Sequence, residues 1–126
     1  MSYFHGVVRL DHHNAQILQF DADSFEAHKV GSHPHETKQH NSEVRTEHEF
    51  FGTVCTALDG ISNVLVTGGH TALNDFRHYV DKHHPQIAAH VIGWEPVNDP
   101  TEGELLAFAR QFFQRHGRLT GTPHGV

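Results

Sequence analysis

One apolar run that ends in two glycines constrains the fold of this chain more than any other feature. Residues 63–67 read NVLVT, the sequence GGH follows, and apolar side chains then recur every three or four residues. An uninterrupted apolar run of this length is typical of a strand buried on both faces, whereas the later spacing is that of a helix. We therefore expect a supporting strand of the sheet that turns directly into a helix, with Thr71 as the N-cap.

Three short strands are predicted before this unit, because hydrophobic and polar residues alternate there with a period of two. They cover approximately residues 3–10, 15–20 and 24–30, and short polar turns separate them. The first strand has apolar side chains on both faces, so it should be covered on both sides. Links this short join neighbouring strands as hairpins, which predicts an antiparallel meander.

Helix and strand alternate in the rest of the chain. Apolar residues at helical spacing predict helices over residues 43–58, from residue 71 and from Thr101, which is followed three residues later by Glu104 in the capping-box pattern. A second buried strand is predicted at residues 90–94. The order is then βββαβαβα. Because the later strands need helical crossovers, we predict an α/β fold with a ribonuclease H-like motif, a mixed five-stranded sheet with helices on its faces.

Length and composition fit one domain that stays in the cytoplasm. The 126 residues suffice for one core, which we place in residues 1–116, with a flexible tail at 117–126. The N-terminus lacks a basic region followed by a long apolar stretch, so neither a signal peptide nor a membrane span is expected. Cys55 is the single cysteine, cannot form an internal disulfide and lies in an apolar helical pattern, so it is predicted to be a small buried hydrophobe.

Histidine is the unusual component of the sequence. The chain has 15 histidines and a formal charge of −6, which becomes +9 when each histidine gains a proton. Residues 31–42, which read GSHPHETKQHNS, have no apolar residue except a proline, and we interpret them as a mobile loop. Two interpretations of its His33, His35 and His40 stay open: a solvated surface, or a weak zinc or nickel site. No other cofactor is predicted.

Cations near the same loop are candidates for contacts with RNA. Lys29, Lys38 and Arg45 lie in or beside it, and His28 precedes it. These side chains would form a local phosphate-binding patch on a protein that is acidic elsewhere.

The glycine pair after the buried strand is a candidate anion site. Gly68, Gly69 and Thr71 would offer backbone N–H groups at a helix N-terminus. The alternative is a tight turn with Thr71 as a cap, and the spacing is not that of a P-loop.

No catalytic motif is specific enough to predict an enzyme. A ribonuclease H-like nuclease needs carboxylates on its central strands to hold two divalent ions, and the first strand has none. Asp11 lies beyond that strand, while Glu95 and Asp99 belong to the far side of the sheet. No serine stands in a nucleophile-elbow context either.

Several short segments carry a resemblance to a known family. They are FHGVV at 4–8 with Asp11, His12 and Ala15, HKVG at 28–31, EHEFF at 47–51 and LVTG at 65–68, continuing through Pro85, Gly93 and the final helix. On these residues the chain resembles the middle domain of archaeal and eukaryotic class-one release factors and of Pelota. It resembles more closely the small bacterial proteins called translational machinery components.

The resemblance implies a role in translation but not peptide release. In the release factors, the loop after the third strand carries a Gly-Gly-Gln tripeptide that promotes hydrolysis of peptidyl-tRNA. The matching residues 31–42 lack it, and Gly68 and Gly69 follow a different strand. We therefore expect a binding module whose partner is the ribosome or RNA. The alternatives are a histidine-rich metal-binding or pH-responsive protein and a hydrolase acting on peptidyl-tRNA. The sequence predicts no oligomeric state.

Overall fold

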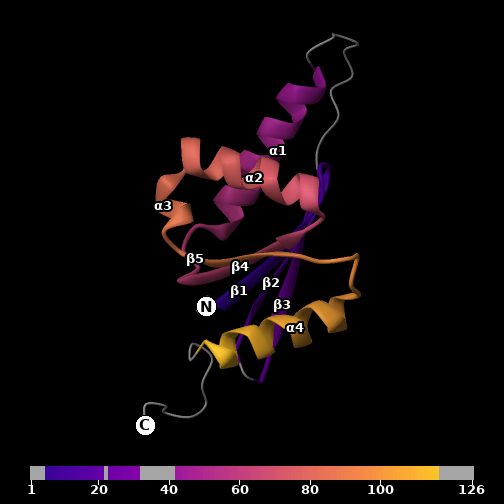
Figure 1. Cartoon of the computed structure of the whole chain (residues 1–126), viewed down its shortest axis with the longest axis vertical. Coiled ribbons are helices and arrows are strands. Elements are labelled where there is room, and N and C mark those ends of the chain that lie inside the picture. Colours follow the sequence, from indigo (N-terminus) through magenta and orange to yellow (C-terminus); the bar gives the residue numbers. More distant parts are fainter. Residues whose placement is uncertain (1–4, 22, 32–41, 117–126) are drawn as a thin grey trace.

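The predicted order of strands and helices is confirmed (Figure 1). The computed structural model describes residues 5–21, 23–31 and 42–116, and of residues 42–46 only the backbone. The elements are β1 (His5–Leu10), β2 (Asn14–Phe20), β3 (Phe25–Gly31), α1 (Ser42–Leu58), β4 (Asn63–Gly68), α2 (His70–His83), α3 (Pro85–Ala88), β5 (Val91–Pro96) and α4 (Glu102–Arg115). No described helix is long and apolar enough to cross a bilayer.

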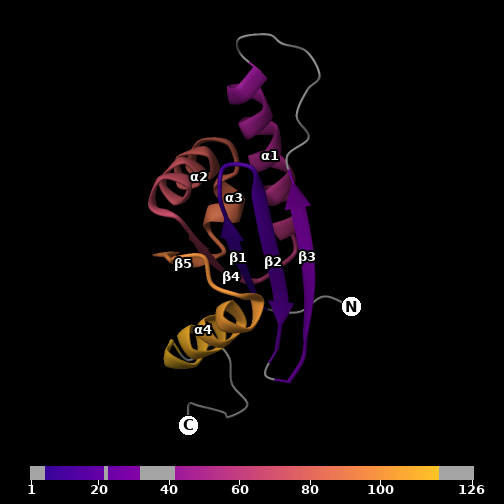
Figure 2. The ribbon, with the colours of Figure 1, turned by 90° about the vertical axis from the view of Figure 1, so that its right-hand side faces the viewer.

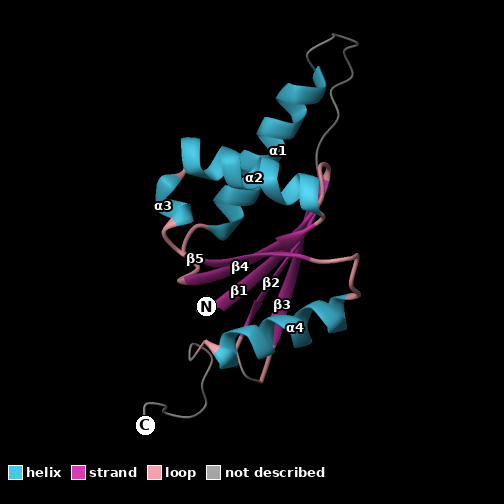
Figure 3. Cartoon of the chain, in the orientation of Figure 1, coloured by secondary structure: helices cyan, strands magenta, loops and turns pink. Residues whose placement is uncertain are grey.

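The five strands form one mixed sheet in the order β3-β2-β1-β4-β5. The first three strands pair antiparallel as a meander, whereas β4 runs parallel to both β1 and β5. Helices α1, α2 and α3 lie on one face of the sheet and α4 lies on the other (Figures 2 and 3). The predicted α/β class and ribonuclease H-like arrangement are therefore correct, with β1 in the middle and β4 as an inner strand beside it.

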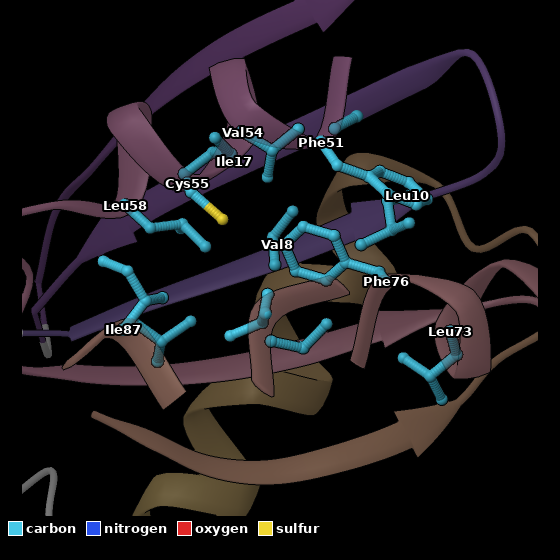
Figure 4. Close-up of a cluster of buried hydrophobic side chains, with 14 of the residues drawn as sticks. Val8, Leu10, Ile17, Phe51, Val54, Cys55, Leu58, Leu73, Phe76 and Ile87 are labelled. Carbon is cyan, nitrogen blue, oxygen red and sulfur yellow. The ribbon is translucent and has the colours of Figure 1, made fainter. Parts of the chain in front are cut away.

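The alternation of β1 divides the core into two layers. Val8 packs with the side chains of α1 and α2, and Val7 packs with those of α4. Figure 4 shows the larger layer, in which apolar side chains from β1, α1 and α2 meet. Burial on both faces explains the apolar composition of the inner strands, because neither face reaches water. The expectation that β1 is covered on both sides is confirmed.

Cys55 lies in the larger layer and is 1% exposed. Loss of hydration disfavours the thiolate, and this burial raises the pKa of the thiol to about 12. Since the thiolate is the nucleophile, we expect a disulfide reagent such as DTNB to label the native protein at pH 8 at least about a hundredfold more slowly than the urea-unfolded chain. Absorbance of the released thiolate measures both rates. Rapid native labelling would contradict this burial.

The start of α2 differs from the sequence prediction, whereas the start of α4 agrees with it. The N-cap of α2 is Gly69, no side chain caps it, and Thr71 already lies inside the helix, so the predicted Thr71 cap is wrong. β4 ends at Gly68, and Gly69 directly after it has the extended conformation of an N-cap. The helix therefore begins earlier than the sequence predicts. In α4, Thr101 and Glu104 form the predicted capping box through bonds of 2.9 and 3.2 Å.

Candidate functional site

The carboxyl ends of four strands meet at one edge of the sheet, which we call the carboxyl edge. β1, β4 and β5 are mutually parallel, and β3 runs the same way because it is antiparallel to β2. Figure 2 shows β1 and β3 ending at the same side. The β1–β2 turn and the N-terminus of α2 lie there too. In open α/β sheets, ligands bind at this edge, which makes it the first candidate for a site.

A groove on the α4 side of the carboxyl edge contains a partly buried arginine. The groove consists of two adjoining hollows, and Arg9, Asp11 and Asp99 line both of them. The Nη1 of Arg9 lies 3.4 Å from Oδ1 of Asp99, whose side chain is 93% exposed, so the pair is weak. The Arg9 Nε is buried and has no hydrogen-bond partner within the described part of the chain. A guanidinium in this position suits a phosphate or carboxylate group.

Of the cations predicted from sequence, Lys29 lines this groove. It lies opposite Gln16 in the β2–β3 register, and Gln16 Nε2 donates a 2.9 Å bond to Glu102 of α4. Lys29 is therefore on the α4 face. His28 precedes it on β3 and must point to the other face, since successive strand residues alternate. The side chains of Lys38 and Arg45 lie outside the described residues.

The glycine pair lines the same groove, but Thr71 does not. Gly68 and Gly69 border the hollow beside Arg9 and Asp99, and the Gly68 carbonyl accepts a 2.9 Å bond from the Val97 N–H. The two carboxylates in the lining oppose an anion, whereas Arg9 favours one. Anion binding at the glycines stays a prediction.

A second cluster lies on the opposite face, where the β1–β2 turn meets α1 and α2. Nε2 of His12 is 3.1 Å from Oδ2 of Asp75 and 3.6 Å from Oε2 of Glu47. Asp11 shapes the turn that carries His12, because its Oδ1 accepts bonds from the backbone N–H groups of His13 and Asn14, at 2.8 and 2.7 Å. Sequence reasoning missed this cluster. Its members come from three elements, and no spacing in the sequence joins them.

A groove between α1 and α2 adjoins the cluster and contains further histidines. Glu47 and Asp75 line it together with His48, His78 and Tyr79, among others. The Tyr79 ring centroid lies 5.4 Å from that of His48, and burial, followed by the nearby Cys55 thiol, raises the pKa of Tyr79. The loop histidines predicted to bind metal, His33, His35 and His40, lie outside the described residues.

Known protein structures contain the same arrangement of elements. The Pelota protein of Thermoplasma acidophilum superposes with a TM-score of 0.62 at 20% identity over 95% of this chain, and an archaeal translation termination factor, aRF1, with 0.64 at 12% over 88%. The chain has the fold of the Pelota and release-factor middle domain. It spans about a third of those proteins, 36% and 34% of their chains.

A eukaryotic protein of known structure has a similar fold. Dom34 of S. cerevisiae, a translation termination-like factor involved in RNA quality control pathways and interacting with Hbs1, matches with a TM-score of 0.52 at 8% identity, over 89% of this chain and 34% of its own. No protein-family model matches the sequence, and comparison with curated proteins gives no match either. At these identities the likeness is one of fold.

Proposed function

We propose that this chain is a translation-associated module that binds the ribosome or its RNA in the cytoplasm. The observation that carries this proposal is the fold, which it shares over 88% of its length with a translation termination factor. A shared fold does not fix a function by itself. It supports a role in translation over the other roles open to a small acidic α/β domain, and the candidate surface below makes the proposal testable.

The proposed contact surface is the carboxyl edge around β3 and the start of α1. Lys29 lies near the end of β3 and Arg9 near the end of β1, both in one groove. Lys38 falls between β3 and α1 in the sequence, and Arg45 belongs to the first turn of α1. The protein carries 9 Lys and Arg against 15 Asp and Glu. A polyanion would therefore have to bind where these few cations gather.

Binding without peptide release is proposed because the sequence contains no Gly-Gly-Gln. The chain between β3 and α1, residues 32–41, reads SHPHETKQHN, and the adjacent glycines Gly68 and Gly69 are followed by His70. These glycines end β4 and cap α2 on the opposite side of β1 from β3. We assign these two glycines a structural role there. The chain therefore lacks the catalytic tripeptide of the release factors that it resembles.

Co-sedimentation with ribosomes through a sucrose cushion tests the proposal. We expect the unaltered chain to pellet with ribosomes at low salt, and the combined variant Lys29→Ala, Lys38→Ala, Arg45→Ala to bind at least about tenfold more weakly. For this variant, the slope of log K against log salt concentration should be shallower by as much as about two to three, because each phosphate contact contributes nearly one to that slope.

A charge-matched variant separates this surface from a general effect of charge. Replacing Lys82, Arg115 and Arg118 by alanine removes the same number of charges from other parts of the sequence, and we expect less than about a twofold change in affinity, because none of the three belongs to the assigned set of contacting cations. Absence of ribosome binding by the unaltered chain at low salt would refute the proposal. Equal losses in both triple variants would refute the assigned surface.

A further inference from the structure

The cluster of His12, Glu47 and Asp75 brings two carboxylates to one imidazole nitrogen. One ligand atom from each residue can be chosen so that all three lie within 4.8 Å of one another. Two such carboxylates repel each other unless a cation lies between them. In the described part of the chain neither of them pairs with a lysine or arginine, because their ion-pair partner there is His12. Two carboxylates beside one imidazole nitrogen are therefore a setting that a bound metal cation would stabilise.

We propose that this cluster is a binding site for a divalent zinc-class ion. A tetrahedral ion with bonds of about 2.0–2.1 Å holds its ligand atoms about 3.3–3.4 Å apart. The Nε2 of His12 is 3.1 Å from the Asp75 oxygen and 3.6 Å from the Glu47 oxygen, which brackets that separation. The three ligand atoms lie within 4.8 Å of one another, so rotation of the two carboxylates would have to bring their oxygens to this spacing.

The ligand types select the metal. Imidazole nitrogen binds zinc, cobalt and nickel well, whereas magnesium prefers an all-oxygen octahedral shell. One nitrogen and two carboxylate oxygens make three protein ligands, which leaves a fourth position for water or for a group of a partner. That position is accessible, because Glu47 and Asp75 also line the open groove between α1 and α2.

The site would connect three elements that are otherwise held by apolar packing. His12 belongs to the β1–β2 turn, Glu47 to α1 and Asp75 to α2. The turn is already ordered by the Asp11 carboxylate, so His12 needs little further ordering to bind an ion. Metal binding would fix the first half of α1 against the carboxyl edge. This role does not depend on ribosome binding.

Calorimetric titration with Zn²⁺ tests the site in a chain whose loop histidines have been removed. The host variant carries His33→Ala, His35→Ala and His40→Ala, so that loop binding cannot contribute to the heat. We expect one saturable Zn²⁺ per chain in this host and none with Mg²⁺. In the same host, His12→Ala should weaken binding by at least about tenfold, because it removes a direct ligand and even the loss of a residue that only orients a ligand costs about tenfold or more in metal affinity.

Two further variants make the result specific. His13→Ala removes the neighbouring histidine of the same turn, which does not belong to the cluster, and should leave the affinity for Zn²⁺ unchanged. Glu47→Gln keeps the shape of its side chain but removes its charge and should weaken binding as His12→Ala does. Co²⁺ should give visible absorption in the host that is lost in Glu47→Gln.

Two outcomes would overturn the proposal. One is the absence of saturable Zn²⁺ binding in the host. The other is binding that survives both His12→Ala and Glu47→Gln. Circular dichroism confirms that each variant is folded before it is titrated.

Discussion

Gly68→Ser should lower the free energy of unfolding by about 2–3 kcal/mol, because a new side chain has no room there. Gly69→Ser should not lower the free energy of unfolding. A Cβ atom at Gly68 would collide with the backbone carbonyl oxygen of Leu10. Leu10 is the parallel partner of Gly68 in the β1–β4 register. The two backbones therefore have to move apart at the carboxyl edge before any side chain fits. Urea denaturation followed by circular dichroism measures the difference.

Gly69 provides the matched control, because it is the next residue in the chain. A Cβ atom there has nothing within 4 Å, and its φ of −68° and ψ of 158° are open to any residue. Serine is a favourable N-cap, so this variant should be as stable as the original or more stable by a few tenths of a kcal/mol. Equal tolerance of serine at both positions would show that β1 and β4 are not this close.

The strand and helix order could be predicted because it depends on local patterns. The apolar run of β4, the alternation of β1 and the Thr101 capping box each lie within a few residues of sequence, and each is confirmed. The N-cap of α2 was placed two residues late for a different reason. A threonine is the better cap by propensity, but the end of β4 fixes where the helix can start, and this is a tertiary constraint.

Lys29, Gly68 and Gly69 were predicted as site residues, but the way in which the candidate sites come together could not be, because their members are far apart in the sequence. His12 and Asp75 are 63 residues apart, and Arg9 on the central strand β1 meets Asp99, which follows the edge strand β5. The abundance of histidine directed attention to residues 31–42. Yet the described residues that offer metal-ligand geometry include one histidine and two carboxylates. Composition indicated the chemistry of the side chains but not which of them meet.

The structure places His28 and Lys29 on opposite faces of β3, which the two-residue period of a strand already implies. His28 and Lys29 are neighbours in the sequence, and the predicted contact patch included both. Residue 28 pairs with Ile17, which belongs to the core beside α1 and α2, whereas residue 29 pairs with Gln16 on the α4 face. A single flat partner cannot contact both faces of β3, so Lys29 is the better test residue for the groove.

Phe76→Ala should be the most destabilising single substitution we propose, lowering the free energy of unfolding by about 3–5 kcal/mol. Phe76 is fully buried, and its ring centroid lies 5.2 Å from that of Phe51 and 6.2 Å from that of Trp94. It joins α2 to both α1 and β5. Truncation leaves a cavity in the larger core layer shown in Figure 4, because a close-packed core relaxes only in part around a lost side chain.

Phe25→Ala is the control for this prediction, since Phe25 on β3 is 40% exposed. Its loss should cost about 1 kcal/mol or less, because water already reaches much of the ring. Urea titration of both variants measures the contrast, and similar costs would contradict the assignment of Phe76 to the core. The contrast also bears on the zinc-class site. Asp75 precedes Phe76 and is half exposed, so α2 presents its ligand only while Phe76 anchors the helix. Phe76→Ala should therefore weaken Zn²⁺ binding although it removes no ligand.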